Sequence, residues 1–178
     1  FANQQKIKKS YLKWNFFITP VFSINNIFYI DDWLTYWNSF YQQLGFAFDS
    51  YVVSLLSHTE HLDFQALPLQ YRPHLVDILQ KSLGHDIFVN WPNEMRGIYY
   101  FISKAITELE NSPDRSDLWG RFLKHTAYFD TKTNMDFAVQ NQRLWNLLSA
   151  QDRELFGSIK QKINIKNSLG REIRQLII

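Results

Sequence analysis

A continuous apolar run followed by an amphipathic helix constrains the fold of this chain more than any other feature. The run covers residues 15–24, NFFITPVFSI, and is typical of a strand that is covered on both faces. Apolar residues then recur at helical spacing over residues 33–44, and Gly45 is placed to stop that helix. Asp31 or Asp32 is placed to be its N-cap. The segment therefore predicts a strand that leads into a helix.

A second strand is predicted at residues 50–57, SYVVSLLS, so that strand, helix and strand form a βαβ unit with a parallel sheet. Binding sites in parallel sheets form where the strands end. The ends of these two strands carry polar residues: Ser23, Asn25 and Asn26 after the first, and His58, Thr59 and Glu60 after the second.

From residue 68 onward the pattern becomes helical. The helix in residues 67–84 has Pro73 in its first turn and Gly84 as its stop, and a longer helix covers residues 90–111. Further helices are expected at residues 3–13, 112–130, 134–149 and 150–170. With no internal repeat and no linker, residues 1–178 are expected to form a single domain, divided into an α/β part (1–67) and a helical part (68–178).

Composition narrows the class of protein. Of the 178 residues 46% are apolar and 17% aromatic, which favours a packed core and argues against disorder. The absence of cysteine excludes disulfides and thiolate-held metals within these residues, and a cytoplasmic location is expected. The longest apolar run, residues 16–30, is too short and too polar for a membrane span. Basic residues gather at both ends, where solvated helix faces are favoured over nucleic-acid binding.

Two groups of side chains could carry chemistry. The tetrapeptide at residues 58–61, His-Thr-Glu-His, has potential metal ligands, but His residues at i and i+3 of a strand point to opposite faces, which favours a polar strand end. Asp114, Asp117 and Asp130 with Arg121 and His125 suggest acid–base work, although helix caps and first-turn acids explain Asp114 and Asp117 more simply.

Aromatic side chains occur at helical spacing and could stack bases, but they are more typical of a core. These aromatics are Trp33, Trp37, Phe40, Tyr41, Tyr99, Tyr100 and Phe101.

The order of four segments resembles the C-terminal half of radical S-adenosylmethionine (radical SAM) proteins of the twitch-type phage and environmental group. The segments are TPVFSINN, IFYIDDWLTYW, SYVVSLLSHTEHLDFQALPLQYRPHL and GRFLKHTAYFDTKTNMDF. Thr126, Phe129 and Asp130 match a pattern of that group, whereas Thr133 stands where the pattern has Arg. The resemblance covers roughly residues 1–150.

The resemblance implies a fold, cofactors and a site. It implies that residues 1–67 are the last β/α units of a partial parallel (βα) barrel-like sheet, followed by a mainly helical C-terminal half. S-adenosylmethionine and a [4Fe–4S] cluster would belong to the parent protein, with the CxxxCxxC loop in a missing N-terminal half, so that this chain is a fragment and inactive alone. Ser23 and Asn25 would contact S-adenosylmethionine or an unknown, conceivably peptide, substrate. The alternative is a non-enzymatic phage or accessory protein-binding module that docks a partner through its aromatic helices.

Overall fold

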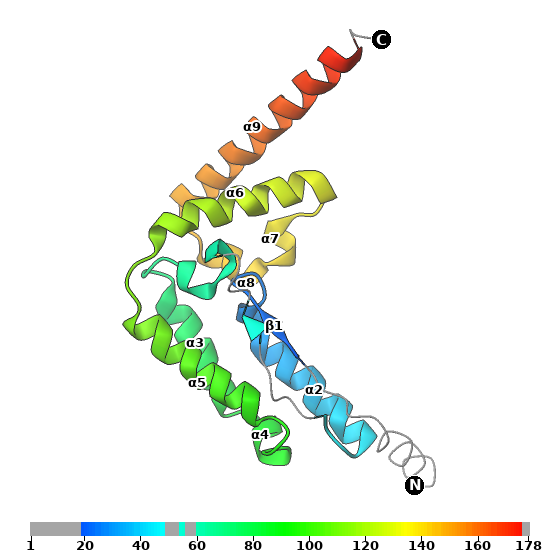
Figure 1. The fold of residues 1–178 in the computed structure, drawn as a ribbon, viewed down its shortest axis with the longest axis vertical. Coiled ribbons are helices and arrows are strands. Elements are labelled where there is room, and N and C mark those ends of the chain that lie inside the picture. Colours follow the sequence, from blue (N-terminus) through cyan, green and yellow to red (C-terminus); the bar gives the residue numbers. More distant parts are fainter. Residues whose placement is uncertain (1–18, 49–53, 56–59, 176–178) are drawn as a thin grey trace.

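The computed structural model describes residues 19–48, 54–55 and 60–175, and most of these residues are helical (Figure 1). The predicted helix at residues 3–13 lies outside the described residues. In chain order the elements are β1 (Val21–Phe22), η1 (Ile27–Tyr29), α2 (Ile30–Leu44), β2 (Ser54–Leu55), η2 (Glu60–Leu62), η3 (Phe64–Ala66), α3 (Arg72–Leu83), α4 (Asp86–Asn90), α5 (Arg96–Asn111), α6 (Ser116–Thr133), α7 (Phe137–Gln140), α8 (Gln142–Leu147) and α9 (Ala150–Gln175).

The predicted α/β fold with a partial parallel barrel-like sheet is wrong. Within the described residues, β1 and β2 pair in parallel over two residues each, and no barrel-like sheet is formed. The remaining described residues of the first predicted strand are not strand, because Thr19, Pro20 and Ser23 have no regular structure and Ile24 lies in a turn. Residues 15–18, 50–53 and 56–57 lie outside the described residues. The described part of the apolar run is therefore a two-residue strand followed by a turn that leads into helices.

A tight turn ends β1. The side chain of Asn26 bridges it, because Nδ2 donates to the carbonyl of Val21 at 2.9 Å and Oδ1 accepts from the amide of Ser23 at 2.8 Å. The next residue, Ile24, is fully buried and donates its amide to the carbonyl of Leu62 in η2 at 2.9 Å. Burial of this apolar residue thus comes from the turn and from η2 rather than from a longer sheet.

The helix predicted after this run is confirmed as α2. Gly45 ends it in the left-handed conformation, with φ of 73°, and donates its amide to the carbonyl of Tyr41 at 2.8 Å. The predicted N-cap is wrong, because Tyr29 occupies that position and Asp31 and Asp32 lie in the first turn. Carboxylates there still interact favourably with the helix dipole.

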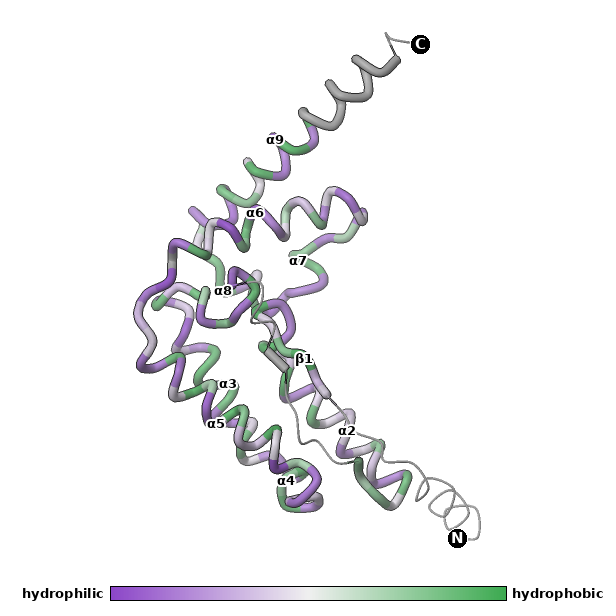
Figure 2. Tube along the Cα trace, viewed as in Figure 1, coloured by the Kyte–Doolittle hydropathy of each residue, from purple (hydrophilic) through white to green (hydrophobic). Residues whose placement is uncertain are grey.

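One hydrophobic cluster joins residues from Phe22 to Phe156, and the apolar faces of α2, α3 and α5 contribute to it (Figure 2). Fully buried members include Leu34 of α2, Leu75 of α3 and Ile102 of α5. The division of the chain into residues 1–67 and 68–178 stays a prediction.

Arg72, at the start of α3, is a buried cation that is 3% exposed. Its guanidinium donates five hydrogen bonds of 2.8–3.3 Å to backbone carbonyls, and burial lowers its pKa. The acceptors are Gln65, Leu67, Leu109, Ser112 and Pro113. Arg72 therefore connects the chain around η3 to the C-terminal end of α5.

The C-terminal helices are joined to this body by α6 and by a polar network at the start of α9. Residues 134–149, predicted as one helix, form two short helices, α7 and α8, that meet at Asn141. At the start of α9, Tyr71 accepts from the amide of Ser149 at 2.9 Å and donates to the carboxylate of Asp152, which also accepts from Trp119 Nε1 at 2.9 Å. From this anchor α9 packs on α6 and then runs out from the body (Figure 1).

Candidate functional site

A cleft lies between α6, α7 and the turn that follows β1, and we call it the α6–α7 cleft. It encloses about 310 Å³. Polar and apolar side chains share its lining: Asn25, His125, Thr126, Phe129, Asp130, Met135, Phe137, Gln140 and Asn141. Three of the residues that carry the radical SAM resemblance, Thr126, Phe129 and Asp130, therefore meet Asn25 in one place.

The structure places the two predicted cofactor-binding residues differently. Ser23 is 5% exposed and its Oγ accepts a 3.3 Å hydrogen bond from the amide of Asn25, so its hydroxyl serves the turn. Asn25 instead lines the α6–α7 cleft. The predicted cofactor contact of both residues stays a prediction, and the geometry favours Asn25 for any contact with a ligand.

Two residues that line this cleft each have a side-chain oxygen that is buried without a hydrogen-bond partner among the described residues: Oδ1 of Asn25 and Oγ1 of Thr126. Thr126 is only 7% exposed. Its neighbours on α6 behave differently, because Thr131 donates to the carbonyl of Ala127 at 2.8 Å and Thr133 donates to that of Phe129 at 2.7 Å. A buried polar group that lacks a partner is costly, so both atoms indicate a place where a ligand group can bind.

Asp130 contributes a carboxylate whose charge is compensated. It is 6% exposed, and its Oδ2 accepts from the amide of Phe137 at 3.0 Å and from Nζ of Lys160 on α9 at 3.0 Å. The pair neutralises the negative charge, and the bond to Phe137 holds the start of α7 against α6. The α6–α7 cleft therefore has polar side chains, and the negative charge of its carboxylate, Asp130, is neutralised by Lys160.

One histidine, His125, lines this cleft, and a second, His61, contacts it. The rings of His61, in η2, and His125 are 4.7 Å apart between centroids, and His125 in turn lies 4.7 Å from the ring of Phe129. Burial lowers the pKa of His61, and the positive charges of His125 and Arg121 lower it further. The Nε2 atom of His61 is buried without a partner among the described residues. The lowered pKa favours the neutral form of His61 beside the His125 ring.

The acids proposed for acid–base work are not gathered in one site. His125 and Asp130 both line the α6–α7 cleft, whereas Asp117 lies in the first turn of α6 and pairs with Arg115 at 3.7 Å. The tetrapeptide at 58–61 is described only from Glu60 onward, and no group of three potential metal ligands occurs in the described part of the chain.

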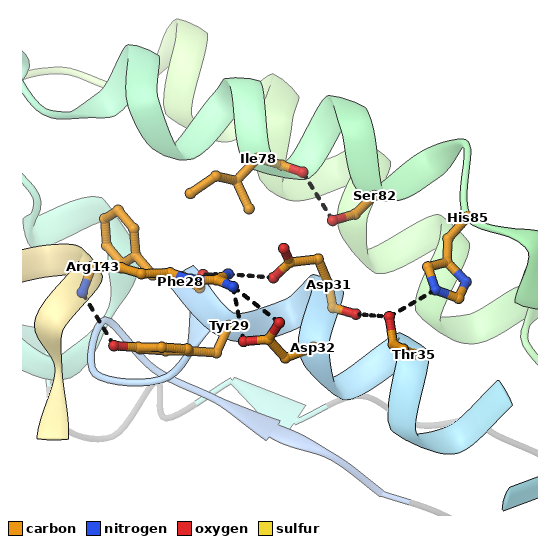
Figure 3. Close-up of polar contacts among 9 residues, drawn as sticks. All are labelled: Phe28, Tyr29, Asp31, Asp32, Thr35, Ile78, Ser82, His85 and Arg143. Atoms are coloured by element: carbon orange, nitrogen blue, oxygen red, sulfur yellow. Dashed lines mark hydrogen bonds and ion pairs between the residues drawn. The ribbon is translucent and has the colours of Figure 1, made fainter. Parts of the chain in front are cut away.

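A second cleft, of about 360 Å³, lies beside the N-terminus of α2 and includes Asp31, Ser82, His85 and Arg143. Its central cation is Arg143, which bonds to Asp32 through two contacts of 2.8 and 2.9 Å and lies over the ring of Tyr29 (Figure 3). It also bonds to Asp31 and to the carbonyl of Phe28. Burial alone would lower the pKa of Arg143, but the two carboxylates outweigh burial and raise it.

The histidine of this second cleft is also fully engaged. His85 Nδ1 accepts from the amide of Ile87 at 3.1 Å, so the proton is on Nε2, which donates to Oγ1 of Thr35 at 3.1 Å (Figure 3). The Thr35 hydroxyl in turn donates a hydrogen bond to the carbonyl of Asp31 at 2.9 Å. Because Arg143 and His85 both have partners within the chain, this cleft positions α2, α4 and α8 and is a weaker ligand site than the α6–α7 cleft.

Sequence reasoning missed several residues of the α6–α7 cleft, among them Met135 and Asn141, and also Lys160, which pairs with the cleft residue Asp130. One signal was present in the sequence: Asn134, which ends α6 with φ of 55°, is followed by Asp136, whose side chain accepts from the amide of Ala138 and caps α7. A helix stop followed at once by a cap predicts the break that shapes one wall of the cleft.

Comparisons with protein-family models, with curated proteins and with solved structures find no match for this chain. None of the helices in the described ranges combines the length and apolar character needed to cross a bilayer.

Proposed function

We propose that this chain is a non-enzymatic binding module whose α6–α7 cleft takes a small neutral ligand that carries an amide. The observation that carries the proposal is that two residues lining the cleft each have a buried oxygen without a partner among the described residues, Asn25 Oδ1 and Thr126 Oγ1. An amide supplies an N–H donor for the Asn25 carbonyl oxygen and a C=O acceptor for the Thr126 hydroxyl. Its binding would provide partners that the fold does not.

Charge and shape support a neutral ligand with an apolar part. The one carboxylate in the lining, Asp130, is already paired with Lys160, so a charged ligand would gain little from it. Phe129 and Met135 are 50% and 56% exposed and offer apolar surface beside the polar atoms. The volume of about 310 Å³ lies at the lower end of small-molecule sites.

The test uses matched fragments that differ in one group: carboxamides, the corresponding methyl ketones and the corresponding carboxylates. Binding is followed by two-dimensional nuclear magnetic resonance of the labelled chain. We expect the carboxamides to bind best and to shift resonances of Asn25, Thr126 and Asn141. Thr126→Val and Asn25→Ala should weaken binding, whereas Thr131→Val, a control on the same helix, should not. Carboxylates that bind as well as carboxamides, or shifts that map to the cleft around Arg143, would contradict the proposal.

The second candidate is the C-terminal portion of a radical SAM enzyme, in which the same cleft would contact S-adenosylmethionine. It is favoured by the meeting of Asn25 with Thr126, Phe129 and Asp130 in one cleft. It stands second because the barrel-like sheet that it implies is not formed by the described residues. Titration with S-adenosylmethionine separates the two candidates: saturable binding that Asn25→Ala weakens favours the enzyme, and no binding disfavours it. The peptide substrate, the missing N-terminal half and the cytoplasmic location stay predictions.

A further inference from the structure

A groove between α6 and α9 lies apart from both clefts, and we call it the α6–α9 groove. It encloses about 500 Å³. The walls are mainly apolar, with Tyr128 from α6 and Leu155, Ile159 and Ile163 from α9. Tyr128 and Leu155 are 50% and 44% exposed. The groove exists because α9 packs on α6 and then diverges from it as it leaves the body (Figure 1).

Two lysines, Lys124 and Lys162, belong to the lining of this groove, one from each helix. Neither forms an ion pair among the described residues. Other lysines do, since Lys81 pairs with Asp77 one turn away and Lys160, on another side of α9, pairs with Asp130. The α6–α9 groove therefore combines apolar walls with two uncompensated positive charges, one on either side.

We propose that this groove docks an amphipathic helix of a partner protein, with an apolar stripe flanked by Asp or Glu. A third helix is the element whose side-chain ridges fit a groove between two helices. Acidic residues beside its stripe would meet Lys124 and Lys162, and these charges would favour the correct partner and speed association. A second copy of α9 is a poorer occupant, because it would bring its own Lys162 against these cations. The proposal is independent of the ligand in the α6–α7 cleft.

Two glycines provide a sharp pair of variants. Gly120 lines the groove, Gly157 is exposed elsewhere on α9, and a Cβ at either position would meet nothing within 4 Å. Leu has the higher helix propensity at both positions, so neither Gly120→Leu nor Gly157→Leu should destabilise its helix. Only Gly120→Leu places a large side chain in the α6–α9 groove. For charge, Lys124→Glu is matched by Arg96→Glu, which makes the same change on the exposed surface of α5.

The experiment selects helical peptides from a displayed library against the intact chain, with Gly120→Leu as the counter-selection target. We expect enriched peptides to carry an apolar stripe flanked by acids. Their binding should weaken at least about tenfold in Gly120→Leu and Lys124→Glu and should fall with rising salt. Gly157→Leu and Arg96→Glu should bind as the wild type does. Circular dichroism of each variant establishes that it is folded.

Several outcomes would overturn the proposal. One is the absence of any enriched peptide, and another is peptides that are basic or that bind Gly120→Leu as well as the wild type. A third is that the chain binds vesicles of phosphatidylcholine and phosphatidylglycerol but no peptides, and that Gly120→Leu abolishes this binding. That result would make the groove a lipid-binding surface. A fourth is concentration-dependent dimerisation that Gly120→Leu abolishes, seen by analytical ultracentrifugation, which would make the occupant a second copy.

Discussion

Replacing Thr126 with Val should make the free protein more stable, although it removes a polar group from the candidate site. The hydroxyl of Thr126 is buried and has no partner in the described part of the chain, and a group of this kind costs about 1–3 kcal/mol. Val has nearly the same shape and a similar helix propensity, so the change introduces neither a cavity nor a large backbone effect. Because the residue keeps 7% exposure, we take the lower end of the range and expect a gain of about 1 kcal/mol.

Thr131→Val is the matched control, because it makes the same chemical change on the same helix. The Thr131 hydroxyl donates to the carbonyl of Ala127, four residues earlier, at 2.8 Å. That carbonyl is also placed to accept the helical hydrogen bond from the backbone amide of residue 131, so removing the hydroxyl leaves no orphaned group. We expect the free energy of unfolding to change by less than about 0.5 kcal/mol.

Urea unfolding, followed by circular dichroism and by tryptophan fluorescence, measures both variants against the wild type. For a chain of this length, a gain of 1 kcal/mol corresponds to a rise of about 2–4 °C in the melting temperature. In urea, the midpoint concentration should rise for Thr126→Val without a change in the slope of the transition. If Thr126→Val destabilises the chain, or changes its stability no more than Thr131→Val does, the Thr126 hydroxyl has a partner within the protein. The proposed amide site would then lose its main support.

Three further predictions concern groups outside this hydroxyl. Arg72→Lys should lower the free energy of unfolding in urea by about 2–3 kcal/mol, because an ammonium cannot reach all five carbonyls; a loss below about 0.5 kcal/mol would contradict this. Arg143→Lys should lower the free energy of unfolding by about 1 kcal/mol in the same assay. Lys81→Ala, which removes an exposed ion pair, is the control, and an equal or larger loss in Lys81→Ala would contradict the prediction. The lowered pKa of His61 means that the unfolded chain binds more protons, so stability should fall as pH drops below the ordinary value of 6.5 and level off below the lowered pKa. His61→Phe should flatten that dependence in melting curves taken between about pH 5.5 and 7.5, and an unchanged slope would contradict the assignment.

Local signals in the sequence were sufficient for some of the helices, although the predicted helices at 90–111 and 134–149 have other bounds in the structure. The stripe over residues 33–44 predicted α2, and Gly45 stops it with φ of 73° because only glycine adopts that conformation at no cost. The stop at Gly84 and the stripe of α5 were likewise readable. These features could be predicted because they depend on neighbours within one or two helical turns.

The strand at residues 15–24 could not be judged in the same way. A continuous apolar run indicates burial but does not say what covers it. In the described part of this run, Ile24 is buried by a turn and by η2, and the turn itself is closed by the side chain of Asn26. The asparagine was visible in the sequence, but its bonds to Val21 and Ser23 decide where the strand ends. The prediction of a barrel-like sheet was wrong because the sequence did not show that the strand ends here.

The candidate site was harder to predict because its decisive property is a missing interaction. Thr126 and Thr131 occupy the same helix and have the same intrinsic helix propensity, so propensity does not show which of the two hydroxyls lacks a partner among the described residues. What separates them is the packing of segments far away in the chain, since Asn25 comes from the turn after β1 and Lys160, which neutralises Asp130, comes from α9. A sequence can nominate Asn25 as polar and placed after a strand, as it did here. Only the folded chain shows that its oxygen and the Thr126 hydroxyl are both buried, that both lack a partner among the described residues, and that the two residues line the same cleft. These three facts together are the reason to look for a ligand there.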